Sequence, residues 1–319
     1  MDEFELIDRI TRQLAQHADV RIGPGDDAAE LVLRHGSVLA STDILVEGVH
    51  FRQDWTTPYD LGRRAAAQNL ADITAMGGTA CALLVAVAAP RGTDSSWFTE
   101  LARGLRDECD LVGASVIGGD LSAGPALVVS VTVLGDCAGG APVTRAGARP
   151  GDVVALAGRL GWSATGLAAL QRGATVDAPL LEAYRSPQPP YPAGPLGRAA
   201  GATAMIDVSD GLLADAAHIA DASAVTLALD AAALQPDAPV VAACDVLGLD
   251  PIAAVLTGGE DHAILATFPV AADGTAAVPS PLFRVIGRVL ARGEHGVLVD
   301  GAPHAGPGGH DHFAEVHHG

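Results

Sequence analysis

The chain has 319 residues, of which 49% are apolar, and a formal net charge of −19. This length favours two domains with a buried core each, and the apolar fraction argues against a disordered protein. The longest apolar run, residues 80–89, is about half as long as a membrane-spanning helix, and the first five residues are acidic where a signal peptide would be basic. We therefore expect a soluble cytoplasmic protein that binds no membrane and, given its charge, no nucleic acid.

All 19 basic residues are arginine, a bias that a GC-rich genome would also produce. A Walker-A nucleotide site, a protein kinase and a Schiff-base enzyme each need a lysine, so the sequence excludes these three classes. The four cysteines form no C-x-x-C pair, which favours free thiols in a reducing compartment. They are Cys81, Cys109, Cys137 and Cys244.

Apolar spacing predicts the elements of the first half. Phe4, Ile7, Ile10 and Leu14 recur at helical spacing and predict an amphipathic helix over 4–14. A Gly/Asp loop follows at 23–27, and a strand through 38–40 is expected to end at Ser41-Thr42-Asp43. The remaining predictions are a helix over 60–76, a buried strand over 80–88, a helix over 95–111 and a strand over 126–135.

The second half repeats this alternation after a connection rich in Gly, Pro and Arg at 139–152. We place the domain boundary there, between 148 and 149, and expect two domains, each of the α/β or α+β class. The predicted strands lie at 153–157, 225–229, 263–268, 283–289 and 297–299, and a further strand is expected to run into residue 206. The predicted helices cover 163–171, 211–221 and 238–247, and a Pro-rich linker covers 186–195.

Six short motifs place carboxylates beside glycines or at the ends of apolar strands, in a chain with 28 Asp and only 10 Glu. Aspartate oxygens suit Mg²⁺, and glycines let backbone N–H groups approach phosphate oxygens. The motifs are Gly23-Pro24-Gly25-Asp26-Asp27, Ser41-Thr42-Asp43, Asn69-Leu70-Ala71-Asp72, Gly118-Gly119-Asp120, Asp207-Val208-Ser209-Asp210-Gly211 and Gly258-Gly259-Glu260-Asp261.

Any one of these motifs is more often a turn or a helix cap than a ligand. Asp43 or Asp210 alone would be read as a cap. The occurrence of six motifs in a chain without lysine favours Mg-nucleotide chemistry built on carboxylates.

The motifs resemble those of the thiamine-monophosphate kinase family over nearly the whole chain, from about residue 22 to the terminal GHDHF. The strings are GPGDDAA, STDILVEGVHF, NLADITAMGG, IGGD, TRAGARPGD, IDVSDGL and LTGGED. The STD-x-LVEGVHF string and a terminal G-x-DHF are specific to this family. The GGD and DxSDG elements belong to the wider aminoimidazole-ribonucleotide synthetase superfamily.

The resemblance implies a two-domain aminoimidazole-ribonucleotide synthetase-like fold with an N-terminal α/β domain (1–148) that binds ATP and Mg²⁺ and dimerises through its sheet. A C-terminal α+β domain covers 149–319. The implied reaction transfers the γ-phosphoryl group of ATP to thiamine monophosphate. The acceptor is a phosphate whose second pKa is about 6. Direct in-line transfer therefore needs no covalent nucleophile and no general base, and we expect no catalytic residue of either kind.

The resemblance also implies roles for individual residues. The implied Mg²⁺ ligands are Asp26, Ser41, Thr42, Asp43, Asp72, Asp120, Asp207 and Asp210. The implied ATP contacts are Gly119, Asp120, Arg145 and Ser209, and the implied substrate contacts are His50, Glu260 and His310.

Two positions depart from the family pattern. The family usually shows GGEDYEL, whereas this chain has GGEDHAI at 258–264. His310 stands where the family usually has an aromatic residue that would stack on the substrate ring, and an imidazole still offers a planar surface. Five histidines lie in the last sixteen residues, which is compatible with a metal-binding tail or with a solvated terminus.

The alternative functions are those of other enzymes of the same superfamily and that of a non-catalytic binding protein. Selenophosphate synthetase uses an N-terminal Cys and Lys pair, and the hydrogenase-maturation relative carries a terminal Cys. This chain has neither feature. The amide-activating site of aminoimidazole-ribonucleotide synthetase is not recognisable here. A dimeric binding protein that has lost activity would account for the changes at His262, Ala263 and His310.

Overall fold

A computed structural model describes residues 3–24, 29–33, 35–304 and 308–309. The chain divides into two compact units. Unit 1 comprises Met1–Pro142 together with Arg185–Pro195, and unit 2 comprises Val143–Tyr184 together with Leu196–Gly319. The structure thus divides after Pro142, whereas the sequence predicts a boundary between 148 and 149.

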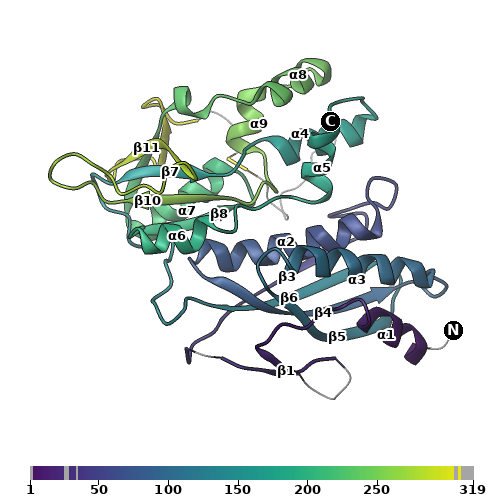
Figure 1. Cartoon of the computed structure of the whole chain (residues 1–319). Coiled ribbons are helices and arrows are strands. Elements are labelled where there is room, and N and C mark those ends of the chain that lie inside the picture. Colours follow the sequence, from purple (N-terminus) through teal and green to yellow (C-terminus); the bar gives the residue numbers. More distant parts are fainter. Residues whose placement is uncertain (1–2, 25–28, 34, 305–307, 310–319) are drawn as a thin grey trace. The chain divides into compact units, whose positions relative to one another are not determined.

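Unit 1 is built on a four-stranded sheet in the order β3-β6-β4-β5 (Figure 1). Its elements are α1 (Glu3–Thr11), β1 (Val20–Ile22), β2 (Glu30–Leu31), β3 (Leu39–Val46), α2 (Pro58–Ala75), β4 (Thr79–Ala89), α3 (Ser95–Cys109), β5 (Ser115–Ala123) and β6 (Val128–Asp136). β6 pairs antiparallel with both β3 and β4, and β4 pairs parallel with β5 through the α3 crossover. β1 and β2 form a separate two-stranded ribbon.

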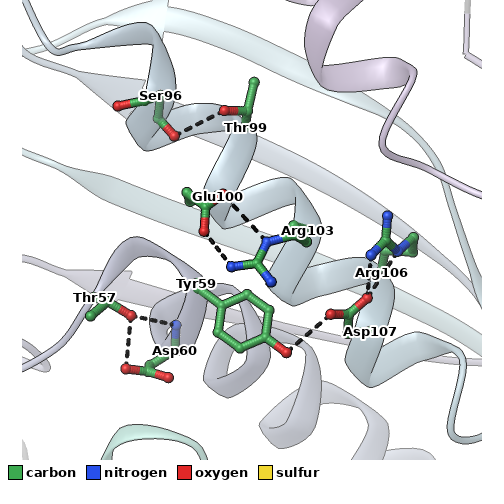
Figure 2. A network of polar contacts seen from close by, with 9 residues as sticks. All are labelled: Thr57, Tyr59, Asp60, Ser96, Thr99, Glu100, Arg103, Arg106 and Asp107. Atoms are coloured by element: carbon green, nitrogen blue, oxygen red, sulfur yellow. Dashed lines mark hydrogen bonds and ion pairs between the residues drawn. The ribbon is translucent and has the colours of Figure 1, made fainter.

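Helices α2 and α3 lie side by side on one face of this sheet (Figure 1). Glycines permit their close approach, because a Cβ on Gly62 would lie 2.1 Å from the Leu101 carbonyl oxygen and one on Gly104 would lie 2.0 Å from that of Tyr59. Polar contacts cross the same pair, as Figure 2 shows. The Tyr59 hydroxyl donates to Asp107 Oδ2 at 3.0 Å, and the Arg103 guanidinium lies 4.1 Å from the centre of the Tyr59 ring.

The face of the sheet opposite α2 and α3 is exposed in unit 1. Strand alternation sends Leu45, Val85 and Val131 to the buried core under the helices and the residues between them to the other side. Ile44 of β3 is 51% exposed and Leu84 of β4 is 39% exposed on that other side. The sheet of β3, β6, β4 and β5 therefore has an open face with apolar side chains on it.

The segment Arg185–Pro195 belongs to unit 1 although its flanks belong to unit 2. The Arg185 guanidinium donates to the Trp55 carbonyl at 2.6 Å, and the Tyr191 hydroxyl donates to Glu108 Oε1 at 2.6 Å. Glu108 is buried and also pairs with Arg63 at 2.7 Å, so its charge is compensated. The sequence predicts only a linker here, and the structure shows a segment bound to α2 and α3.

Unit 2 is built on a six-stranded sheet in the order β12-β9-β11-β7-β10-β8. Its elements are β7 (Val153–Ala157), α4 (Trp162–Arg172), α5 (Ala178–Arg185), α6 (Ala193–Ala199), β8 (Ala204–Val208), α7 (Leu212–Ser223), β9 (Val225–Leu229), η1 (Ala231–Leu234), α8 (Ala238–Leu247), α9 (Pro251–Thr257), β10 (Ala263–Phe268), β11 (Phe283–Ala291) and β12 (Val297–Val299). All pairs are antiparallel except β12 with β9.

Apolar clusters stabilise unit 2, and the described residues include a larger and a smaller one. The larger lies between the sheet and α7 and includes Leu156, Ile206 and Leu265. The smaller joins α4, α5 and α8 around Trp162 and Cys244, and the Trp162 indole N–H donates to Asp237 Oδ2 at 2.7 Å. α7 packs on β8 and β9, so the turn between β8 and α7 stands at one end of the larger core.

Most predicted elements are present, with several differences. β3 continues to Val46, so Ser41-Thr42-Asp43 lies inside the strand and does not end it. The elements that the sequence did not predict are β1, β2, β5, α5, α6, η1 and α9. The strand β5 contains the Gly118-Gly119-Asp120 motif, whose glycines and acid concealed the period-two pattern.

In the described part of the chain, no single helix has the length and hydropathy of a membrane span. The bent pair α8 and α9, which meet at 114°, reaches those values only when the two helices are taken together.

Candidate active site

In unit 1, β3 and α2 bring three predicted metal ligands to one interface. Ser41 and Asp43 alternate with Leu45 along β3, so their side chains share the face on which α2 packs. The Ser41 hydroxyl donates to Asp72 Oδ2 of α2 at 2.6 Å. The side chains of Ser41, Asp43 and Asp72 thus form a polar cluster between β3 and α2.

Thr42 and Asp120 point away from that cluster. The Thr42 hydroxyl donates to the Val131 carbonyl at 2.9 Å, on the exposed face of β3. Asp120 pairs in register with Ala86, whose side chain is also exposed. Within unit 1 the structure therefore places the predicted ligands on both faces of the sheet.

Gly119 sits where β5 approaches β4 too closely for a side chain. A Cβ at this position would lie 1.9 Å from the carbonyl oxygen of Val85. The glycine is thus required by strand packing in unit 1, whatever its role toward a nucleotide.

His50 follows β3 in a tight turn. The Val46 N–H donates to His50 Nδ1 at 3.0 Å, and the His50 carbonyl accepts from Arg64 at 3.1 Å. Because Nδ1 accepts a hydrogen bond, the neutral ring carries its proton on Nε2. His50 can therefore donate from Nε2 to an acceptor such as a phosphate oxygen.

In unit 2, the turn between β8 and α7 carries three predicted site residues. Asp207, next to the end of β8, is buried, and its Oδ2 accepts from Nδ1 of the buried His262 at 3.2 Å. Ser209 and Asp210 follow in the half-buried turn. Gly211 has φ of +126°, and a Cβ there would lie 2.7 Å from the Thr257 carbonyl oxygen, so only glycine fits.

The Gly258–Asp261 motif is bound directly to this turn. The Glu260 N–H donates to the Ser209 carbonyl at 2.7 Å, and the His262 N–H donates to the Val208 carbonyl at 2.8 Å. Two motifs about fifty residues apart in the sequence thus form one surface. The structure brings Asp207, Ser209, Asp210 and Glu260 together in unit 2.

Two acidic residues of this region were not predicted as part of the site. Asp215 accepts three backbone hydrogen bonds from the β8–α7 turn. Asp261 accepts from the N–H groups of Gly161 at 2.5 Å and Ser163 at 2.9 Å and so caps α4. Burial raises the pKa of each carboxyl to about 7. A sequence feature that could have indicated the role of Asp215 is its position four residues after Gly211, in the first turn of a helix.

Arg145 lies at the far end of α7. Its carbonyl accepts from the Ser223 hydroxyl at 3.0 Å, and Ser223 is the last residue of that helix. A twelve-residue helix is about 18 Å long, so the structure does not bring Arg145 to Ser209.

Asp26 and His310 lie outside the described residues. The residues just before His310 are described and contact the acidic turn: the Gly308 carbonyl accepts from the Ala214 N–H at 3.0 Å, and a Cβ on Gly309 would lie 2.5 Å from the Asp210 carbonyl oxygen.

The chemistry of the donor groups suits a hard cation. Among the described residues, no group of three or more His, Cys, Asp and Glu side chains is arranged to hold a metal ion. The predicted ligands are carboxylates and hydroxyls. Mg²⁺ typically takes one or two carboxylates and completes its shell with water and substrate phosphates, so these groups fit the ion.

Comparison with known proteins decides the family. Residues 25–137 match the family model "AIR synthase related protein, N-terminal domain", and residues 149–300 match its C-terminal counterpart. A thiamine-monophosphate kinase of Mycobacterium tuberculosis is 48% identical over 316 residues, covering 99% of this chain and 92% of the relative. The chain belongs to the thiamine-monophosphate kinase family. A member from Corynebacterium glutamicum is 40% identical, covering 94% of this chain and 90% of the relative.

Solved structures of thiamine-monophosphate kinases have the same fold. The enzyme of Stenotrophomonas maltophilia superposes with a TM-score of 0.80 at 34% identity, covering 95% of this chain and 98% of that one. A structure described as "AaThiL complexed with AMPPCP and TMP" gives 0.79 at 32% identity, with 98% and 97% covered. A hydrogenase maturation protein, at 18% identity and a TM-score of 0.73, shares the fold alone.

Proposed function

We propose that this chain catalyses the ATP-dependent phosphorylation of thiamine monophosphate to thiamine diphosphate. The observation that carries the proposal is the near full-length match to thiamine-monophosphate kinases at 48% identity. The relative that carries both AMPPCP and TMP supports it, because AMPPCP is an analogue of ATP. We propose that the boundary between the two functional domains lies between residues 148 and 149.

The transfer is direct and in line. The acceptor phosphate has a second pKa of about 6, so at neutral pH it is already a nucleophile and no residue has to remove a proton. What the protein must supply is alignment of two groups that repel each other. Mg²⁺, when bound, neutralises charge on the phosphates.

The roles we propose follow the chemistry of each side chain. Asp43 and Asp72 offer carboxylates to the cation, and the Ser41 hydroxyl orients Asp72. Within unit 2, Asp207 and Asp210 offer carboxylates to a cation, and His262 donates to Asp207. The full proposed ligand set is Asp26, Ser41, Thr42, Asp43, Asp72, Asp120, Asp207 and Asp210.

The other proposed contacts act on the two substrates. We assign Gly119, Asp120, Arg145 and Ser209 to ATP, and His50, Glu260 and His310 to thiamine monophosphate. For His50 the support is its Nε2–H tautomer, which donates to an anionic oxygen. For His310 it is the contact of Gly309 with Asp210.

The proposal includes a homodimer formed through the open sheet face of unit 1, and a cytoplasmic location. The exposed Ile44 and Leu84 support the dimer, because apolar side chains on a sheet face are usually covered. All four cysteines are free thiols, which suits a reducing compartment.

An ADP-release assay coupled to a second enzyme tests the activity. We expect ADP release that requires thiamine monophosphate and stops when EDTA removes the divalent cation. Binding of both substrates without ADP release would overturn the proposal in favour of a binding protein. Undiminished release in EDTA would overturn the metal role alone.

A further inference from the structure

The inference concerns Asp215, in the first turn of α7. Its Oδ2 accepts the N–H groups of Ser209, Asp210 and Gly211, each at 3.1 Å. The residue is 2% exposed, so the three hydrogen bonds are made inside unit 2. One buried carboxylate therefore holds three consecutive peptide groups of the turn.

Three successive N–H groups at the start of a helix form a site that attracts anions. Here a side chain of the same helix fills that site from within. The backbone of residues 209–211 consequently has no N–H group left for a phosphate oxygen. The turn presents the acidic side chains of Asp207 and Asp210 instead, and these attract cations.

Burying a carboxylate has an energetic cost, which the three hydrogen bonds offset. Burial and the neighbouring Asp207 and Asp210 raise the pKa of Asp215 to about 7. An alanine would avoid this cost, and α7 already contains several alanines. The carboxylate at this position thus serves the turn, through the three N–H groups that it holds.

The opposite side of the turn is held by a different segment. The Glu260 N–H binds the Ser209 carbonyl at 2.7 Å, and the His262 N–H binds the Val208 carbonyl at 2.8 Å. Carbonyl groups are thus held from one side and N–H groups from the other. Loss of Asp215 would free the peptide planes of 209–211, and Asp210 would lose its orientation.

We propose that Asp215 is a positioning residue for the phosphoryl transfer: by holding the peptides of Ser209–Gly211 it directs the Asp210 carboxylate toward the cation that accompanies the nucleotide. It touches neither substrate. The inference rests on the proposed function, because it takes Asp210 as a ligand of that cation.

The test measures Mn²⁺ binding to the full-length chain from the electron paramagnetic resonance signal of the free ion. Residues that orient metal ligands typically contribute about 10- to 100-fold in affinity, so we expect Asp215→Asn to weaken Mn²⁺ binding about tenfold. Asparagine keeps the size of the side chain but loses its charge. Unchanged affinity in Asp215→Asn would overturn the inference.

Asp152→Asn is the matched control. Asp152 is 5% exposed, and its carboxylate accepts from the Arg149 N–H and the Thr203 hydroxyl. Asp152 directly precedes Val153 of β7, which pairs with Phe268 at one end of β10. Val208, beside the acidic turn, pairs with Ala263 at the other end of β10, so the control lies away from that turn. We expect Asp152→Asn to lower the melting temperature without changing Mn²⁺ affinity. Equal weakening in both variants would mean a general loss of structure and would overturn the inference.

Asp210→Asn separates the inference from the proposed function. Unchanged Mn²⁺ affinity in Asp210→Asn would overturn the metal assignment itself. Weakening in Asp210→Asn but not in Asp215→Asn would overturn only the positioning role. In kinetics, high Mg²⁺ should restore the activity of Asp215→Asn, which a purely structural defect would not allow.

A measurement on the wild-type protein covers the case in which Asp215→Asn fails to fold. Residue-resolved hydrogen exchange should show the amides of Ser209, Asp210 and Gly211 protected in the metal-free chain. Exchange at the rate of an open loop would overturn the inference.

Discussion

His262 shows how one residue changes the chemistry of its neighbours. It stands at the position of the tyrosine in the family string GGEDYEL, and its buried imidazole donates to Asp207 Oδ2 at 3.2 Å. The position thus keeps a hydrogen-bond donor while the ring becomes smaller. Its backbone has φ of +50° and is fixed by the Val208 carbonyl. The departure from the family pattern is therefore compatible with an ordered Asp207.

Asp72 provides the first prediction at the scale of residues. Asp72→Asn keeps the acceptor for the Ser41 hydroxyl but removes one negative charge. Because a single electrostatic contact in catalysis contributes on the order of 10²-fold or more, we expect kcat/KM to fall by that factor. Asp60→Asn, in the first turn of the same helix, is the control and should stay near wild type. Full activity of Asp72→Asn at saturating Mg²⁺ would contradict the ligand role.

The absence of a covalent intermediate is the second prediction. Direct transfer implies that the protein never carries the phosphoryl group, because the acceptor oxygen is itself ionised. Rapid quench after mixing with γ-labelled ATP alone should leave the chain unlabelled. Stoichiometric label that is stable to acid or removed by hydroxylamine would show a histidine or aspartate nucleophile and a different mechanism.

At the scale of elements, a remote side chain caps helix α4 of unit 2. α4 begins after Gly161, which has φ of +78° and provides no side-chain cap. Asp261 supplies the cap from the turn before β10. The same turn binds the Ser209 carbonyl through Glu260. One segment therefore joins the start of α4 to the β8–α7 turn.

The cap predicts a pH dependence of stability. The folded pKa of Asp261 is raised to about 7, above the ordinary value of about 3.9. Between these values the folded state holds a proton that the unfolded state has lost, so stability declines as pH rises from about 4 to about 7. We expect the melting temperature of the wild type to fall from pH 5.5 to pH 8 more than that of Asp261→Asn. Parallel curves for the two proteins would contradict the assignment.

At the scale of the whole molecule, we expect a partner to bind the open sheet face of unit 1. Ile44 and Leu84 are exposed there, and α2 and α3 cover only the opposite face. An exposed apolar sheet face is a common site of association.

The predicted assembly is a dimer, with a mass by light scattering of roughly twice 32.1 kDa. Ile44→Arg puts a charge into the interface and should shift the mass toward the monomer, because an unpaired buried charge is costly. Val246→Arg, on the exposed side of α8 in unit 2, is the control and should leave the dimer intact. A wild-type monomer at micromolar concentration would contradict the dimer.

Residue patterns alone determined the family, the two domains of mixed helix and strand, and the limits of five elements. β7, β9, β10, β12 and α8 have the predicted limits, because apolar spacing reports burial along a single element. The motif strings predicted which acids belong to the site, because their chemistry is local to each string. Asp207, Ser209, Asp210 and Glu260 do lie together.

Only the tertiary structure decided which side chains face one another. Strand register sends Thr42 and Ser41 to opposite faces of the first sheet, and the packing of α7 separates Arg145 from Ser209. Asp215 and Asp261 act through hydrogen bonds to backbone groups, and the tertiary structure identifies those backbone partners. The return of Arg185–Pro195 to unit 1 depends on Tyr191 reaching the buried Glu108, 83 residues earlier. Such contacts depend on long-range packing, and the local sequence does not specify them.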